Sequence, residues 1–528
     1  MKKQRFITSL LTALVLSGLQ AQIAPTTPRL VIGLTIDQLR TDYVYAFSAL
    51  YGEGGFKRLL KEGRIYANAE YDFIHTDASS AVAAIYTGAT PYYNGIPGNA
   101  WMDRNSLAVV KSVDDPQYMG IYTSETASPK NLVVSNLSDE LMVATQGMAE
   151  VYAIAPTKEM AILAAGHAAK GAFWLNETTG KWCGSTYYGD FPSWVSEYND
   201  REGLDFRINS IVWRPYLPVI QYKYVTSQTR QITFKHSFDD ERMAKYKKFK
   251  ASPYINDEVN RLFGSFLDKT RIGRDNVPDF VSLSYYAGNF DHQSVTDCPM
   301  EIQDTYARLD RSLAVLFDLI DRKVGLQNTL IVITSTGDAD SDPIDQERYR
   351  IPGGEFHIER CAALLNMYLM AIYGPGQYVD TYFDRQIFIN HKLVEEKKLN
   401  LTEVLNKSAD FIIQMSGVCD AYSSQRLRLG AWTPKIGKVK NYMSARRCGD
   451  IYVEVAPGWS LVNKYSNSRK VVRESYTSTP IVFMGLNVRP EVIKVPVKIG
   501  AIAPTMAHYM RIRAPNACSV SPITDICK

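Results

Sequence analysis

Three apolar runs stand out along the chain, each bounded by polar or turn residues. They cover Arg29–Ile36, Phe280–Tyr285 and Asn328–Thr334, and Asp37 follows the first of them. Apolar runs of this length are typical of strands that are covered on both faces, as in a parallel sheet. The pattern therefore predicts a buried parallel sheet with polar residues where its strands end.

An amphipathic helix is predicted between the second and third runs. Its apolar residues recur at spacings of three and four: Ile302, Tyr306, Leu309, Leu313, Leu316 and Ile320. Strand, helix, strand is the crossover unit of α/β proteins, whose ligands bind at the carboxyl ends of the strands. We predict a doubly wound, mostly parallel α/β sheet. Residues 186–275 are rich in Tyr, Lys and Arg without a clear period, and they are predicted to form an inserted cap.

The first 21 residues have the three-part pattern of a secretory signal peptide. Three cationic residues precede the apolar run Ile7–Leu16, and small residues lead to Ala21. The run is too short to span a bilayer, and no later run reaches about 18 uninterrupted apolar residues. We expect cleavage after Ala21 and export to the periplasm, the cell envelope or the medium. The mature chain, residues 22–528, is expected to have no transmembrane segment.

Composition and charge give no indication of a nucleic-acid partner or of a structural zinc site. The chain has 528 residues, of which 46% are hydrophobic and 22% charged, as in ordinary globular proteins. The formal net charge of +4 falls to about +1 without the cations of the predicted signal peptide, so no nucleic-acid partner is indicated. The seven cysteines include no CxxC pair, and no structural zinc site is indicated.

Residues 75–99, HTDASSAVAAIYTGATPYYNGIPGN, are typical of a loop that presents a nucleophile at the start of a helix. Small residues lead into an apolar run, and Gly, Pro and Asn close the segment. A helix N-terminus favours an anionic group, because its first N–H groups and the helix dipole attract negative charge. The segment therefore directs attention to the residues just before the apolar run.

Several stretches together resemble the alkaline phosphatase superfamily, in particular the phosphate-irrepressible bacterial alkaline phosphatases and the related type I phosphodiesterases/nucleotide pyrophosphatases. They include IDQLRTDY at 36–43, IYTGATP at 85–91, AILAAGH at 161–167, RRCGDIYVEVAPGW at 446–459 and APTMAHYMRIRAPNA at 503–517. These stretches run in family order over nearly the whole mature chain. The resemblance implies an alkaline-phosphatase-like fold over residues 22–528.

The resemblance also implies a site. In the family, two zinc ions are held by three Asp and three His, and a Thr or Ser at a helix N-terminus attacks phosphorus. An Asn, a Lys and an Arg hold the phosphoryl oxygens, while the two cations stabilise the attacking and leaving oxygens. Carried over residue by residue, Asp37 and His292 keep metal-ligand identities and Asn99 keeps the phosphate-binding identity.

The other positions of the resemblance have lost their chemistry. Ala78 stands at the nucleophile position, and Thr157 and Glu159 stand where the Lys and the Arg are expected. The four remaining metal positions carry neutral residues: Gly288, Thr336, Gly337 and Ser478. Converging carboxylates are tolerated only where cations neutralise them, so neutral replacements agree with loss of the metals. We expect no bound zinc and no other cofactor, although zinc is the family's metal.

Alternatives that would preserve a site remain open. Ser79 and Ser80 neighbour the lost nucleophile, although we interpret them as capping residues of a helix over Ala81–Thr87. A shifted alignment would enlist three acids spaced as in a calcium loop, but the segment lacks the glycine of an EF-hand. These acids are Asp338, Asp340 and Asp342. Asp291 and His292 together would form an incomplete metal shell.

Structural roles are also open for the retained residues. Asp37 is interpreted as an N-cap of the helix that contains Leu39 and Tyr43, and Asn99 as a turn residue. The other histidines are expected to be structural or exposed.

Three functions are compatible with these residues. The first is a pseudoenzyme that binds a protein partner or a ligand through the former cleft, and the second is a metal-dependent phosphomonoesterase or phosphodiesterase with a rearranged site. The third is a component of an envelope assembly. The fold does not decide among them. The sequence favours the pseudoenzyme and leaves the partner and any residual hydrolysis open.

Overall fold

The computed structural model describes residues 27–527, except for 224–232, 240–244, 294, 296, 340–351, 431–432, 464–467 and 473–477. The predicted signal peptide, residues 1–21, lies outside the described residues. Of the helices that are described, none is long and apolar enough to cross a membrane.

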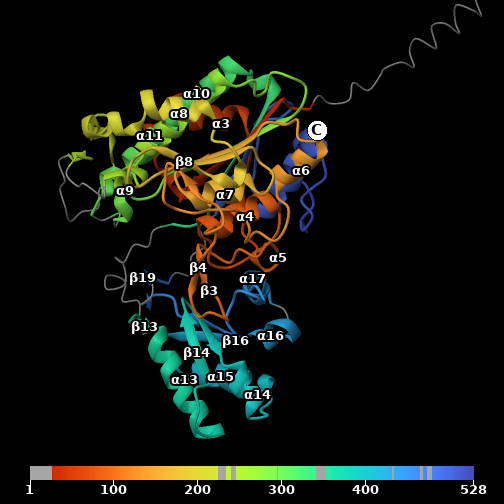
Figure 1. The fold of residues 1–528 in the computed structure, drawn as a ribbon. Helices are drawn as coiled ribbons and strands as arrows, with labels where there is room; N and C mark the ends of the chain where they lie inside the picture. Colours follow the sequence, from red (N-terminus) through yellow and green to blue (C-terminus); the bar gives the residue numbers. More distant parts are fainter. Residues whose placement is uncertain are drawn as a thin grey trace, which may run out of the picture.

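The larger part of the molecule is built around an eleven-stranded sheet (Figure 1). At its centre β1 (Leu30–Asp37) lies between β11 (Asp279–Tyr286) and β12 (Thr329–Ser335) and runs parallel to both. These strands coincide closely with the three apolar runs. β6 (Val151–Ala155) continues the parallel part beyond β11, and β20 (Thr479–Gly485) pairs with β12 in antiparallel fashion. The predicted mostly parallel α/β sheet is confirmed.

Shorter strands extend the sheet on both sides. Beyond β20 lie β2 (Arg64–Glu70), β21 (Glu491–Ile493) and β22 (Val497–Lys498). Beyond β6 lie β7 (Gly171–Leu175), β8 (Trp182–Ser185) and β5 (Gly120–Ile121).

Helices cover both faces of this sheet, as a doubly wound fold requires. Alternate residues of β1 point to opposite faces, so that Leu30 and Ile32 belong to one apolar core and Val31 to another. The first core is covered by α3 (Phe56–Glu62), α8 (Ser193–Arg201), α10 (Tyr254–Lys269) and α11 (Pro299–Lys323). The second is covered by α4 (Ala78–Thr87), α6 (Leu137–Ala144), α7 (Lys158–Ala165) and α18 (Ile502–Met510).

Two helices in these layers are the predicted crossover helix and the helix that follows the predicted nucleophile loop. α11 joins β11 to β12 and buries all six of the apolar positions that predict it, so the crossover helix is confirmed. α4 is fixed on β1 by Tyr86, whose hydroxyl donates to the Gly33 carbonyl at 3.1 Å. A Cβ at Gly33 would lie 2.7 Å from that hydroxyl, so glycine allows α4 to pack this closely.

Residues 186–275, the segment predicted as a cap, contribute α8, α9 (Lys245–Lys250), α10 and the short strands β9 (Val212–Trp213) and β10 (His236–Ser237). Their buried side chains, such as Trp213 and Phe263, belong to the same apolar core as Leu30.

A smaller lobe with its own apolar core extends from the main body (Figure 1). The sequence pattern did not single it out. Its four-stranded antiparallel sheet has the order β14-β15-β17-β16, with β14 (Val379–Phe383), β15 (Gln386–Ile389), β17 (Ile451–Val455) and β16 (Val418–Ser423). Its helices are α13 (Ile358–Tyr373), α14 (His391–Glu396) and α15 (Leu401–Ile412). Two further helices, α16 (Ser424–Leu429) and α17 (Pro434–Tyr442), join the lobe to the main body, because their buried residues belong to the core that α4 covers. A three-stranded sheet of β13 (Glu355–His357), β18 (Ser460–Asn463) and β19 (Ser468–Val471) adjoins the lobe.

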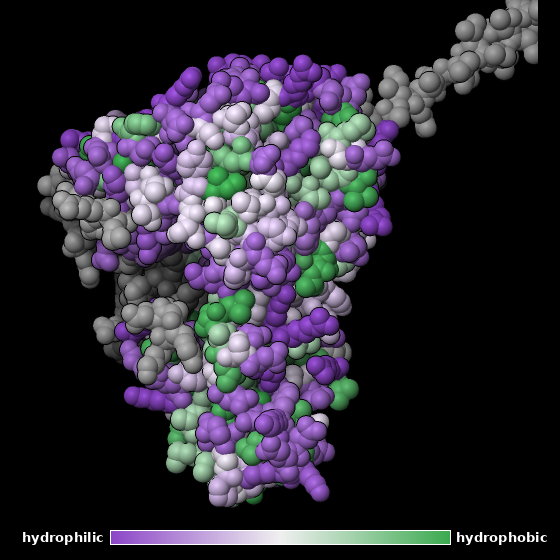
Figure 2. Space-filling view, in the orientation of Figure 1, coloured by the Kyte–Doolittle hydropathy of each residue, from purple (hydrophilic) through white to green (hydrophobic). Residues whose placement is uncertain are grey.

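The main body contacts the lobe through α5 (Pro91–Asn94) and through the hairpin of β3 (Ala100–Met102) and β4 (Val109–Lys111). α5 packs against α17, and β3 packs against β14. In the space-filling view the lobe is the narrower lower part of the molecule, and on this face the apolar residues are scattered (Figure 2).

Candidate functional site

The positions singled out by the resemblance meet at one edge of the large sheet. Asp37 ends β1, Gly288 follows β11, and Thr336 follows β12, and these three strands are parallel. Ser478 directly precedes β20, which is antiparallel to β12, so it lies at the same edge. α4 follows β2, which is also antiparallel to β20, and Ala78 at its start therefore lies at this edge too.

Asp37 is bound by Thr336. The Thr336 hydroxyl donates to Asp37 Oδ1 at 2.7 Å and accepts the backbone N–H of Gln38 at 3.2 Å. The N-cap interpretation of Asp37 is wrong, because α2 (Thr41–Ala46) begins four residues later and Arg40 is its capping residue. A neutral hydroxyl thus contacts the carboxylate at a place where the resemblance expects a cation.

The two glycines at this edge are closely surrounded. A Cβ at Gly288 would overlap the Gln38 side chain and lie 2.6 Å from the Tyr286 hydroxyl. Gly337 has a φ of 71°, and a Cβ there would lie 2.7 Å from the Tyr71 ring. Tyr71 is buried and its hydroxyl donates to the Ser335 carbonyl at 2.7 Å. Neither glycine can be replaced by Asp or His without displacing a neighbour.

A small cavity remains beside Gly288. It has a volume of about 10 Å³ and is bordered by Gln38, Arg40, Tyr43 and Asn289. A cavity of this size is at the lower limit of what holds one water molecule.

The start of α4 is capped by the chain's own polar groups. The Asp77 carboxylate accepts the N–H groups of Ser80 at 2.9 Å and of Asn99 at 2.6 Å. Asn99 Oδ1 accepts the N–H of Ser79 at 3.1 Å. Two N–H groups of the first helical turn, the groups that bind anions at a helix N-terminus, are thus already bonded.

The hydroxyls beside Ala78 belong to this capping arrangement. Ser80 Oγ accepts the Asp77 N–H at 3.0 Å and forms a capping box with it, and Ser79 Oγ lies 2.9 Å from Ser112 Oγ. The predicted helix boundary at Ala81 is wrong: α4 begins at Ala78, because Asp77 rather than a serine is the N-cap. Asn99 acts here as a side-chain cap and not merely as a turn residue.

The start of α7 carries the positions where the resemblance expects the Lys and the Arg. The Thr157 hydroxyl is buried and has no hydrogen-bond partner among the described residues. Burial raises the pKa of Glu159 above its ordinary value. Lys158, which the sequence analysis passed over, is buried and pairs with Asp114 at 2.5 Å and with Glu125 at 3.2 Å. The lysine between the two positions is therefore held by carboxylates.

The remaining candidate metal ligands do not come together in a metal-binding cluster among the described residues. His292 is exposed in a turn, the 3-10 helix η6 (Phe290–His292), and both Asp291 and His292 have positive φ. Asp338 accepts the N–H of Ala339 at 2.9 Å, whereas Asp340 and Asp342 lie outside the described residues. Within the ranges that the structure describes, no three His, Cys, Asp or Glu side chains are placed to hold a metal ion.

The chain is similar to known alkaline phosphatases over nearly its whole length. It is 28% identical to alkaline phosphatase PafA of Elizabethkingia meningoseptica, over 98% of each chain. It is also 28% identical to alkaline phosphatase PhoV of Synechococcus elongatus, over 96% of this chain and 95% of that one.

The fold agrees with these similarities. The crystal structure of wild-type PafA superposes with a TM-score of 0.85 and 27% identity, covering 96% of this chain and 100% of that one. The family model of the type I phosphodiesterase / nucleotide pyrophosphatase matches residues 31–478. The chain therefore belongs to the type I phosphodiesterase / nucleotide pyrophosphatase family, within the alkaline phosphatase superfamily.

Proposed function

We propose that this protein is a pseudoenzyme of the alkaline phosphatase superfamily, which binds a ligand or a protein partner without hydrolysing phosphate esters. The observation that carries the proposal is the start of α4. Ala78 offers no nucleophile there, and Asp77 and Asn99 take N–H groups that would otherwise face an anion. A carboxylate at this point repels a phosphoryl group instead of attracting it.

A solved variant of PafA supports the correspondence of positions. This variant carries four substitutions, at a threonine, an asparagine, a lysine and an arginine. The threonine and asparagine lie as far apart in sequence as Ala78 and Asn99 do here. The lysine and arginine lie as far apart as Thr157 and Glu159. Of these four identities, this chain keeps only the asparagine.

The residues at the sheet edge do not fit two zinc ions. Thr336 and Ser478 are weaker metal ligands than the carboxylate and imidazole that they replace. Asp37 is engaged by Thr336, and the space for longer side chains at 288 and 337 is filled. Without cations, a hydroxyl such as that of Ser79 would lack both activation and a stabilised leaving group. We therefore derive no hydrolytic step for this chain.

The test pairs metal analysis with an activity assay. Mature protein, gel-filtered at neutral pH with zinc supplied, is expected to hold well below one zinc per chain and to leave an aryl phosphate uncleaved. Ala78→Thr is expected to stay inactive, because the residues of a catalytic site act together and a single restored group gains little. PafA prepared in the same way is the positive control.

Two zinc ions per chain, or robust zinc-dependent turnover by the wild type or by Ala78→Thr, would contradict the proposal. Such a result would support the rearranged hydrolase that the sequence analysis left open.

The same proposal includes export and action in the cell envelope, on the strength of the cationic and apolar pattern that ends at Ala21. Mass spectrometry of protein from the native host is expected to find a mature chain that begins at Gln22. A chain that retains residues 1–21 in the cytoplasmic fraction would contradict export.

A further inference from the structure

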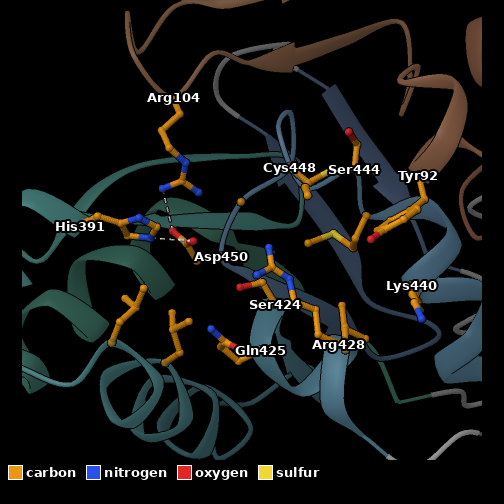
Figure 3. Close-up of a pocket in the computed structure, with 16 residues that line it drawn as sticks. Tyr92, Arg104, His391, Ser424, Gln425, Arg428, Lys440, Ser444, Cys448 and Asp450 are labelled. Atoms are coloured by element: carbon orange, nitrogen blue, oxygen red, sulfur yellow. Dashed lines mark hydrogen bonds and ion pairs between the residues drawn. The ribbon is translucent and has the colours of Figure 1, made fainter. Parts of the chain in front are cut away.

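A cavity of about 140 Å³ lies where the small lobe meets the main body (Figure 3). Tyr92 of α5 and Arg104 of the β3–β4 loop line it from the main body. The remaining lining residues come from the lobe, chiefly from α15, and from the joining segment of α16, α17 and the residues that follow α17. None of the metal-ligand, nucleophile or phosphate-binding positions carried over from the resemblance lines it. The cavity is thus separate from the site at the edge of the large sheet.

The cavity wall contains a carboxylate whose charge is balanced by neighbouring side chains. Asp450 is buried and accepts hydrogen bonds from Arg104 at 3.0 Å, from His391 at 2.9 Å and from the Ile389 N–H at 2.8 Å. Burial alone would raise the pKa of Asp450, but His391 and Arg104 hold it below its ordinary value. Its negative charge is therefore balanced within the cavity wall and leaves little repulsion for an incoming anion.

Two further cationic side chains line the cavity, Arg428 of α16 and Lys440 of α17. Among the described residues that line it, Asp450 is the only acidic one. Among the described residues Arg428 has no carboxylate within ion-pair distance, and its side chain reaches from α16 toward the cavity in Figure 3. Arg428 is exposed, so its guanidinium is accessible from the solvent. A guanidinium binds a carboxylate through two parallel hydrogen bonds.

Part of the cavity wall is apolar. Leu401 and Leu405 of α15, Leu427 of α16, and Met443 line it. The cavity volume is close to the roughly 150 Å³ of an engineered apolar cavity that binds benzene. The space therefore suits an apolar body of about that size, with a charged group turned toward Arg428.

We propose that this cavity binds a small organic anion, a monocarboxylate with an aromatic or branched aliphatic body. The carboxylate pairs with Arg428, and the apolar body lies against the leucines of α15. Because Tyr92 and Arg104 come from the main body, such a ligand contacts both parts of the molecule. The proposal does not depend on whether the chain hydrolyses phosphate esters.

Benzoate is the probe, and titration calorimetry of the mature protein is the measurement. Benzoate is expected to bind with one site per chain, and benzamide, which has the same shape without the charge, at least tenfold more weakly. Arg428→Gln is expected to lower the benzoate affinity at least tenfold. Arg426→Gln is the matched control, because Arg426 lies on the same helix, does not line the cavity, and has its carboxylate neighbour Asp420 at 4.0 Å.

A second variant tests the apolar part of the site. Ala445→Leu places a larger side chain in the cavity lining and is expected to abolish benzoate binding, with folding checked by circular dichroism. Equal binding of benzoate and benzamide, undiminished binding by Arg428→Gln, or no binding of benzoate at millimolar concentration would each overturn the proposal. Competition by inorganic phosphate alone, without competition by an uncharged aromatic, would show an anion site without the apolar recognition proposed here.

Discussion

At the scale of single residues, the site is closed by neutral and aromatic side chains. Thr336 binds Asp37, Tyr71 covers Gly337, and Gln38 lies over Gly288. The contact with Thr336 occupies a carboxylate lone pair that a metal ion would need. The other two contacts occupy space that a longer, metal-binding side chain would need. Restoring ligand identities one by one therefore meets steric resistance as well as missing partners.

Gly337→Ala tests this closure. The residue has a φ of 71°, so any side chain adds backbone strain, and its Cβ would lie 2.7 Å from Tyr71. Gly147→Ala is the matched control, because Gly147 has a φ of 81° and nothing within 4 Å of a Cβ. Strain alone costs about 1–2 kcal/mol at both positions, and the contact with Tyr71 adds about 1–3 kcal/mol at 337. Urea denaturation measures the free energy of unfolding of both variants. Equal losses of stability would show that the Tyr71 ring moves aside at little cost.

His167 gives a prediction about pH. Its Nδ1 lies 2.9 Å from Asp139 Oδ2, and the hydrogen bond to Asp139 is the main cause that raises the pKa of His167. The folded state therefore binds this proton more tightly than the unfolded state. The resulting stabilisation is complete below the unfolded pKa of about 6.5 and is lost as the pH rises through the folded value.

The measurement compares the free energy of unfolding of wild type and His167→Gln at pH 5.5 and pH 9. The difference between them is expected to be larger at pH 5.5. In an Asp139→Asn background the pH dependence of that difference should disappear, and its persistence would rule out Asp139 as the cause.

At the scale of elements, the start of α4 links the helix to the loop that carries Asn99. Asp77 accepts one N–H from the helix and one from that loop, so a single carboxylate holds both. The neighbouring helix α6 also begins with a capping box, in which Asn136 is the N-cap and Asp139 its partner.

Asp77→Ala is expected to cost about 2 kcal/mol, the upper end of measured N-cap losses, because two N–H groups lose their acceptor. Asp77→Asn keeps one carbonyl acceptor and should cost less. Denaturant unfolding provides the values, and hydrogen exchange at the amides of Ser80 and Asn99 shows whether the loss is local. Unchanged exchange at both amides would contradict the dual role of Asp77.

At the scale of the whole molecule, Arg104 ties the main body to the small lobe. It extends from the β3–β4 loop and pairs with Asp450, which is buried among residues of the lobe. Removing one partner of a buried ion pair is costly, because the other charge stays buried with less compensation. Without Arg104, Asp450 would keep only His391 and the Ile389 N–H as hydrogen-bond donors among those described above.

Arg104→Met is therefore expected to destabilise the protein by about 3 kcal/mol and to increase proteolysis of the lobe. The control is Lys392→Gln on α14, whose pair with Glu396 is exposed and should contribute under about 0.5 kcal/mol. Thermal unfolding and limited trypsin digestion measure the two effects. Equal stability of both variants would show that the lobe is held by other contacts.

The sequence by itself determined the sheet and its crossover helix. The run Arg29–Ile36 has no charged residue after Arg29, and a strand this apolar is typically buried on both faces. The spacing of Ile302 to Ile320 likewise allows one amphipathic helix. Because the motifs lie in family order, the sequence also placed the chain in its superfamily. These features depend on residues that are close together in the sequence, so the sequence alone is enough to predict them.

Only the tertiary structure decided how the site is closed and what surrounds it. The acceptor of the Thr336 hydroxyl, the cover over Gly337 and the pairs of Lys158 join residues far apart in the chain, so no local pattern encodes them. The same holds for the cavity between the lobe and the main body, since Arg104 and Asp450 meet only when both parts have folded. Contacts of this kind depend on packing in three dimensions, and that packing assigns each polar group its partner.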